Sequence, residues 1–143
     1  MSGKQPKRKD RPDIDRYGRT ELHYAAKEND VAKAQGLFKD KVDVNAKDDN
    51  EWTALHFAAQ SNSLDIAKLL LEAGAEVDPT DSSGNTPLST AVFNYRGKGD
   101  VIELLRQTNA DPCRENHHGQ SPLGLARLIA NTDVSKCFDD LPK

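Results

Sequence analysis

The stretch Thr53–Gln60, TALHFAAQ, decides how this chain folds, because similar octapeptides recur at a fixed distance on both sides of it. TELHYAAK begins at Thr20, 33 residues earlier, and TPLSTAVF begins at Thr86, 33 residues later. SPLGLARL begins at Ser121, after a longer interval of 35 residues. A period of this length indicates a repeat architecture, in which each unit buries its apolar face only against its neighbours.

The period divides the chain into four units, near residues 15–47, 48–80, 81–115 and 116–143, preceded by a short tail. The two extra residues of the third unit fit within YRGKG, residues 95–99. Residues 1–12 carry a net charge of +4, which leaves −7 on the rest of a chain whose total is −3. We expect the basic tail to be disordered, as short charge runs usually are. An acidic repeat domain favours a basic partner and disfavours nucleic acid.

Each unit has the pattern of a helix, a turn, a second helix and an extended return. Good N-cap residues open the first helices, because their side-chain oxygens accept an orphan backbone N–H; they are Thr20, Thr53, Thr86 and Ser121. Apolar spacings of i, i+3, i+4 and i+7 predict one packed face on the second helices. These spacings are Ile66, Leu69, Leu70 and Ala73 in the second unit, and Val134, Cys137, Phe138 and Leu141 in the fourth. Gly74 and Asn109 are suited to the left-handed conformation that ends such helices.

These segments resemble the ankyrin repeat, a 33-residue unit built on a Thr-Pro-Leu-His-x-Ala phrase. DRYGRTELHYAA, DDNEWTALHFAA and DSSGNTPLSTAV look like three successive copies, and NHHGQSPLGLA like a degraded fourth. The resemblance covers roughly residues 13–141 and includes the ending LLLEAGAEVD. It implies an all-α repeat solenoid in which each unit adds a β-hairpin to a helix–turn–helix. It also implies a concave surface, lined by hairpin tips and first helices, that binds other proteins without catalysis.

Three departures from the family pattern affect the expected structure. Glu51 stands where the second unit should have a turn glycine, which predicts an altered hairpin there. Ser89 and Gly124 replace the family histidine, so we expect the fourth unit to act as a terminal cap. His23 and His56 occupy that histidine position. The resemblance implies that they form hydrogen bonds at the junction of hairpin and helix, rather than acting as catalytic bases.

Two segments contain part of a possible zinc site and part of a possible phosphate-binding loop, but neither motif is complete. Cys113, His117 and His118 supply three possible zinc ligands, whereas a structural site needs four. The segment RGKGD, residues 96–100, lacks the preceding strand and the following Ser or Thr of a phosphate-binding loop. It is either a tolerated insertion between two helices or a contact specific to a partner. We therefore expect no metal, no cofactor and no small-molecule substrate.

The candidate binding residues follow from stacking, which aligns equivalent positions of successive units. Trp52, the only tryptophan, and Tyr95 lie near the middle of the expected surface, where buried anchors concentrate. Hairpin tips and the ends of the first helices complete the surface, with Gln120 in the fourth tip. The predicted partner-binding residues are Tyr17, Arg19, Lys27, Glu28, Asp49, Asn50, Trp52, Gln60, Ser61, Ser82, Ser83, Asn85, Phe93, Asn94, Tyr95, Arg96, His117 and His118.

The sequence leaves two non-enzymatic classes of function open, and the missing catalytic constellation argues against a third, an enzyme. The first is a module that binds a basic protein through the concave face, such as a dedicated inhibitor or the immunity protein of a basic toxin. The second is an adaptor or localisation module whose basic tail binds nucleic acid or an import receptor. No apolar run approaches the length of a membrane span. No apolar segment follows the basic start, and Cys113 and Cys137 are the only cysteines, so we expect a cytoplasmic protein.

Overall fold

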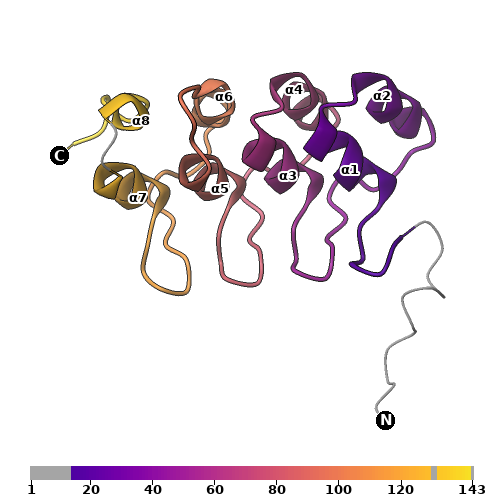
Figure 1. The fold of residues 1–143 in the computed structure, drawn as a ribbon, viewed down its shortest axis with the longest axis horizontal. Helices are drawn as coiled ribbons and strands as arrows, with labels where there is room; N and C mark the ends of the chain where they lie inside the picture. The colour runs from indigo at the N-terminus through magenta and orange to yellow at the C-terminus, as the bar shows by residue number, and fades with distance from the viewer. Residues whose placement is uncertain (1–13, 130–131, 143) are drawn as a thin grey trace, which may run out of the picture.

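The computed structural model describes residues 14–129 and 132–142, and the basic tail lies outside the described residues. The helices of the described part follow in the order α1 (Glu21–Glu28), α2 (Val31–Lys39), α3 (Ala54–Ser61), α4 (Leu64–Glu72), α5 (Pro87–Phe93), α6 (Asp100–Gln107), α7 (Pro122–Leu128) and α8 (Thr132–Lys136). They stand in two rows, with α1, α3, α5 and α7 in one and α2, α4, α6 and α8 in the other (Figure 1). The solenoid expected from the repeat is confirmed.

The turn that precedes each helix of the first row projects away from both rows (Figure 1). The described residues contain no strand, so the β-hairpin expected in each unit is a tight turn rather than a pair of strands. The pairing of Ile14 with Thr20 is an isolated antiparallel bridge. Along the first row, α1 contacts α3, α3 contacts α5 and α5 contacts α7. Small buried residues such as Ala25, Ala26, Ala58 and Ala59 let these helices approach closely.

The predicted N-caps of the first row are confirmed. The hydroxyl oxygens of Thr20, Thr53, Thr86 and Ser121 each accept a hydrogen bond from the backbone N–H three residues later. In the second row, neither Ser63 before α4 nor Gly99 before α6 supplies a side-chain cap. The preceding unit replaces it: Asn29 Oδ1 accepts from Ile66 N at 3.4 Å, and Asn62 Oδ1 accepts from Val101 N at 3.1 Å. These bonds fix the first unit to the second and the second unit to the third.

The predicted face of α4 is wrong at two of its four positions. Ile66 and Leu70 are buried, but Leu69 is only half-buried and Ala73 is exposed. The buried stripe instead includes Ala67, because α4 packs against the first row on one side and against its neighbours in the second row on the others. Ala73 is the residue at which the helix ends, so it no longer belongs to the periodic face.

The predicted helical face of the last unit is also incomplete. Val134 and Phe138 are buried, whereas Cys137 and Leu141 are half-buried. The helix α8 ends at Lys136, and the following residues form turns, so the helical period does not continue to Leu141.

Left-handed backbone conformations occur at both predicted helix ends, and also at positions where the sequence does not predict them, among them one hairpin. Gly74 and Asn109 have φ values of 93° and 71°, as expected. Glu51 takes φ 63° and keeps the same turn as Gly84 at 82°, so the predicted alteration of this hairpin is wrong. The reason is that Asp48 Oδ1 accepts from the N–H groups of Asn50 and Trp52, each at 2.9 Å, and holds the turn closed.

Candidate functional site

The turns and the exposed side of the first-row helices form one surface, which we call the inner face and which corresponds to the predicted concave surface. Two hollows lie on it. The N-terminal groove has a volume of about 410 Å³ and is lined by Arg19, Lys27, Asp48, Asn50, Trp52, Phe57, Gln60, Asp81, Ser82 and Ser83. The C-terminal groove has a volume of about 360 Å³ and is lined by Trp52, Asp81, Asn85, Ser89, Thr90, Phe93, Asn94, Asn116, Gln120 and Leu125. Trp52 and Asp81 border both grooves.

A third hollow, the loop pocket, lies where the first-row helices lead into the second row. It has a volume of about 430 Å³ and is lined by Ala59, Gln60, Ser61, Asn62, Ala91, Asn94, Tyr95, Arg96, Lys98 and Ile102. The segment 96–100 therefore connects α5 to α6, as predicted. Arg96 and Lys98 are exposed, and they supply the positive charge of this pocket.

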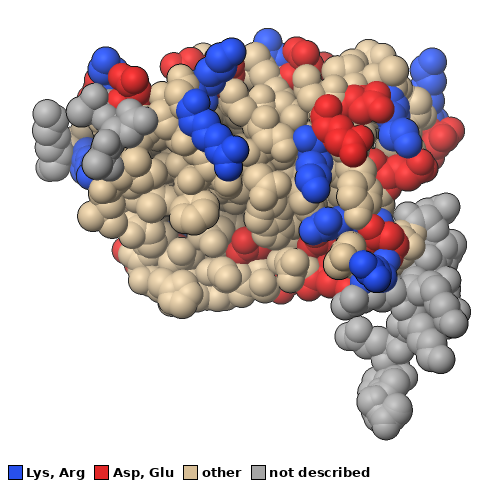
Figure 2. Space-filling view, in the orientation of Figure 1, with Lys and Arg blue, Asp and Glu red and all other residues tan. Residues whose placement is uncertain are grey.

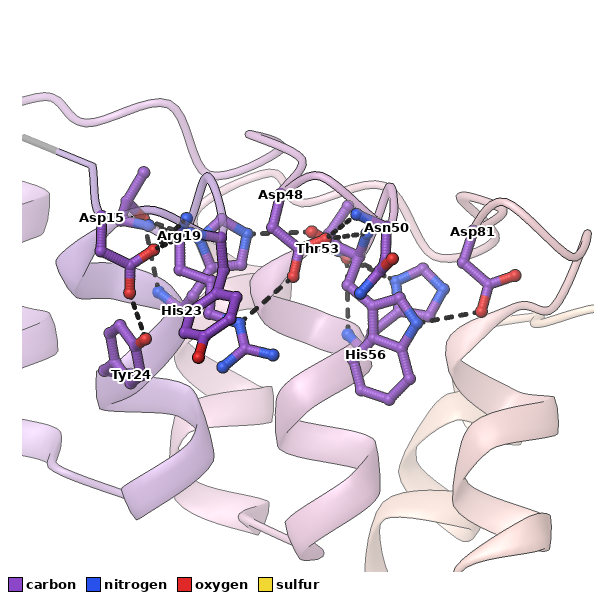
Figure 3. A network of polar contacts seen from close by, with 12 residues as sticks. Asp15, Arg19, His23, Tyr24, Asp48, Asn50, Thr53, His56 and Asp81 are labelled. Atoms are coloured by element: carbon purple, nitrogen blue, oxygen red, sulfur yellow. Dashed lines mark hydrogen bonds and ion pairs between the residues drawn. The ribbon is translucent and has the colours of Figure 1, made fainter. Parts of the chain in front are cut away.

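The turns are tied to one another by a ladder of side chains that repeats from unit to unit. In each step, the residue before the N-cap meets the first residue of the next turn: Arg19 Nε lies 3.5 Å from Asp48 Oδ2, and Trp52 Nε1 donates to Asp81 Oδ2 at 3.0 Å (Figure 3). In the third step, Asn116 Nδ2 donates to Asn85 Oδ1 at 2.9 Å. Because the turns are held before any partner arrives, less ordering is needed on binding.

The family histidines reinforce this ladder, as the sequence predicts. Thr20 N donates to His23 Nδ1 at 2.9 Å, so the ring proton sits on Nε2, which lies 2.9 Å from Trp52 O in the next unit. His56 repeats the arrangement with Thr53 N at 3.1 Å (Figure 3), and its Nε2 lies 3.0 Å from Asn85 O in the next unit. Burial lowers the pKa of both imidazoles, because it disfavours the charged form. Both histidines are therefore structural.

Aromatic rings concentrate around the N-terminal groove. The Arg19 guanidinium lies 4.9 Å from the ring centroid of Tyr17 and 5.0 Å from that of Phe57. Trp52 stacks on His56 with centroids 5.5 Å apart and meets Phe57 edge-on at 4.9 Å. Trp52 is thus half-buried, with part of its ring committed to packing and part lining both grooves. Trp52 therefore contributes both to the packing of the repeats and to the inner face.

Most of the predicted binding residues meet in these hollows. The N-terminal groove collects Arg19, Lys27, Asn50, Trp52, Gln60, Ser82 and Ser83. The C-terminal groove adds Asn85, Phe93 and Asn94, and the loop pocket adds Ser61, Tyr95 and Arg96. The predicted residues that line none of the three are Tyr17, Glu28, Asp49, His117 and His118.

Sequence reasoning missed two apolar residues on the inner face. Leu125 lines the C-terminal groove, and Leu128 is 73% exposed on α7. The signal that identifies Leu128 was present, because it lies seven residues after Ser121 as Phe93 lies seven residues after Thr86.

Charge is distributed unevenly along the stack. On the face shown in Figure 2, charged side chains gather over the N-terminal helix pairs, whereas the part of that face formed by α5, α7 and the turns before them carries few. Cys113 is exposed and Cys137 is half-buried, and neither forms a disulfide. Within residues 14–129 and 132–142, no three His, Cys, Asp or Glu side chains are placed to hold a metal ion. None of the helices in that part of the chain has the length and apolar character needed to cross a membrane.

Comparison with known proteins identifies the repeat. A family described as ankyrin repeats, in three copies, matches residues 22–116. The chain is 40% identical over 88 residues to serine/threonine-protein kinase 12 of Arabidopsis thaliana, covering 62% of this chain and 19% of that protein. It is 29% identical over 147 residues to the B-cell lymphoma 3 protein homolog of Mus musculus, covering 90% of this chain and 32% of that protein.

A third relative is the BCL-6 corepressor-like protein 1 of Homo sapiens, 39% identical over 102 residues, covering 71% of this chain and 5% of that protein. The chain therefore spans between 5% and 32% of the length of these three relatives. The similarity concerns the repeats that this chain shares with much longer proteins.

Proposed function

The chain belongs to the ankyrin-repeat family, a protein–protein interaction module, and on that premise we propose that it binds a partner protein through its inner face without catalysis. The observation that supports this proposal most strongly is the junction at Trp52. Two grooves meet there, on turns that are already fixed to one another by side-chain bonds. Interface hot spots favour tryptophan, tyrosine and arginine near the centre of a surface, and this junction offers Trp52 with Arg19 close by.

The experiment compares the same substitution on two faces. Gln60 is exposed on α3 and lines the N-terminal groove, whereas Gln35 is exposed on α2 in the second row. Partners are captured from the native source by cross-linking and identified by mass spectrometry, with Gln60→Arg and Gln35→Arg compared to the unchanged chain. We expect Gln60→Arg to lose the partner and Gln35→Arg to keep it. The opposite result would place the binding surface on the second row.

The charge of the chain supports a basic partner. Outside residues 1–12 the chain carries −7, and opposite charge speeds association more than it slows dissociation. We propose that the partner has a basic surface, of which a basic toxin bound by a dedicated inhibitor is one form. Raising the salt concentration should then lower the association rate with the captured partner and leave the dissociation rate nearly unchanged. An association rate that does not respond to salt would contradict a basic partner.

The adaptor hypothesis depends on residues 1–12, which lie outside the described residues. It is supported by their net charge of +4, which suits nucleic acid or an acidic receptor surface. Deleting these residues separates the two hypotheses. A binder that acts through the inner face keeps its partner after the deletion, whereas an adaptor loses its second ligand.

A further inference from the structure

One position of the repeat changes from charged to apolar along the stack. The residue seven places after the N-cap is Lys27 in α1, Gln60 in α3, Phe93 in α5 and Leu128 in α7. Phe93 is 74% exposed and Leu128 is 73% exposed. Phe93 lines the C-terminal groove, and Leu128 holds the equivalent position on the neighbouring helix. The inner face therefore ends in two adjacent apolar side chains that solvent reaches.

These side chains differ from the other large apolar residue that is exposed in the described part of the chain. Tyr17 is covered by two guanidinium groups, with Arg16 at 5.1 Å and Arg19 at 4.9 Å from the centroid of its ring. No ring or cation contact of this kind involves Phe93 within the described residues. Exposed apolar side chains that lie together mark interaction sites more often than isolated ones do.

The C-terminal groove beside them is almost free of charge. Its one ionisable side chain is Asp81, whose Oδ1 accepts from Ser83 N and Asn85 N and whose Oδ2 accepts from Trp52. The remaining polar lining consists of amides and hydroxyls. An acidic side chain entering this groove would be repelled by Asp81, and a basic one would lose its water to reach a carboxylate that three N–H groups already bind. The occupant must therefore be uncharged where it lies in the groove.

Two amide side chains of the groove keep hydrogen-bonding capacity for an occupant. Asn94 uses its Nδ2 to donate to Thr90 O, and Gln120 uses its Nε2 to donate to Ser121 O. Neither Asn94 Oδ1 nor Gln120 Oε1 accepts a hydrogen bond from any residue that the structure describes. The groove thus offers acceptors next to an apolar wall, which suits the N–H groups of a backbone.

We propose that the C-terminal groove binds an extended, uncharged segment of the partner protein, with apolar side chains at positions i and i+3 against Phe93 and Leu128. This inference rests on the proposed function and specifies which part of the partner the inner face recognises. Neighbouring packed helices such as α5 and α7 lie about 8–10 Å apart. In an extended chain with three residues per turn and a rise of about 3.1 Å, side chains three apart lie on one side about 9 Å apart.

Spacing alone would also admit an α-helix, because residues seven apart in a helix are separated by about 10.5 Å on one side. The side-chain amides of Asn94 and Gln120 favour an extended segment over a helix. A helix satisfies its own backbone N–H groups, so it would cover Asn94 and Gln120 without bonding them. An extended segment has free N–H groups along its length and can satisfy both side chains.

The test selects ten-residue random peptides displayed on phage against the full chain, and the enriched peptides are then synthesised. We expect uncharged sequences with apolar residues three apart. Their affinity should fall at least tenfold for Phe93→Ser and Leu128→Ser, as for hot-spot truncations. Gln35→Ser on α2 and Lys68→Ser on α4 alter exposed positions of the second row that line none of the three hollows, and they should leave the affinity unchanged. Because all four positions are exposed, thermal unfolding should show that every variant remains folded.

Backbone recognition is tested on the enriched peptide itself. Methylating single backbone nitrogens removes one N–H at a time and should weaken binding at least tenfold at one or two positions. Enrichment of charged peptides, affinity indifferent to Phe93→Ser, full binding by every methylated form, or no enrichment at all would overturn the proposal. If the native partner still distinguishes Gln60→Arg from Gln35→Arg in any of these cases, the proposed function stands and only the extended segment is excluded.

Discussion

Replacing Asp78 by asparagine should stabilise the protein, with a size that depends on pH. Asp78 Oδ2 accepts from Asp111 N at 3.0 Å, but Asp78 Oδ1 is buried without a hydrogen-bond partner among the described residues. Burial raises the pKa of this carboxyl above its usual value, and the nearby charge of Asp111 adds to the effect. Asn45 holds the equivalent place one unit earlier, where its Oδ1 accepts from Glu76 N at 2.8 Å. The repeat therefore already accommodates an asparagine at this position.

The magnitude follows from the buried charge, because asparagine leaves the same buried atom without a hydrogen-bond partner and removes only the charge. Burying part of a carboxylate without a compensating partner costs about 1–3 kcal/mol. Asp78 as a whole is only half-buried, so solvent screens part of this cost and about 1 kcal/mol is expected. A change of that size shifts the melting temperature of a chain of this length by about 4 °C.

The raised pKa of Asp78 determines how the stability gained by Asp78→Asn changes with pH. The folded state holds the Asp78 proton more tightly than the unfolded state, so its contribution to stability is full at low pH and is lost as pH rises through the folded pKa. The advantage of Asp78→Asn should therefore be small near pH 3, grow as pH rises, and level off above the folded pKa.

Urea unfolding followed by circular dichroism at several pH values measures this difference. Asp139→Asn removes the same charge at an exposed position and should change stability little. An Asp78→Asn protein that is less stable than the original at pH 7, or whose advantage is the same at pH 3 and pH 7, would refute the reasoning.

Three other substitutions or conditions test the fold. Leu70→Ala should lower the free energy of unfolding by about 2–5 kcal/mol, measured with urea, because Leu70 is fully buried. Leu69→Ala should lower it clearly less, because Leu69 is half-buried, and equal losses would contradict the observed buried face of α4. Glu51→Gly should raise the free energy of unfolding by about 1 kcal/mol, since a left-handed backbone is strained for glutamate; a lower melting temperature would show that Glu51 contributes another contact. Stability should fall as pH drops below the ordinary histidine pKa of about 6.5, because burial depresses the folded pKa of His23 and His56 and protonation then favours unfolding. Unfolding midpoints at pH 7.5 and pH 5 test this last expectation.

The sequence determined the features that depend on residues close together in the chain. An N-cap hydroxyl accepts a hydrogen bond from the backbone N–H three residues later, so Thr20 and Thr53 predict where their helices begin from residues within a single turn. The fixed period then implies that each unit packs on the next, and the family resemblance placed His23 and His56 in structural roles that the hydrogen bonds confirm. The positions of most candidate binding residues followed from the same register.

Only the tertiary structure decided how neighbouring units meet, because those contacts join residues about one repeat apart whose side-chain directions no local pattern fixes. Trp52 donates a hydrogen bond to Asp81, 29 residues later in the chain, so one part of its ring packs between units and the other part lies on the inner face. Glu51 can hold a left-handed turn because Asp48 closes that turn from the other side of the loop. Leu69 and Ala73 lie outside the buried stripe because α4 has neighbours on several sides and ends at Glu72. The exposure of Leu128 likewise depends on what packs against α7, which is set by the stack as a whole rather than by the local sequence.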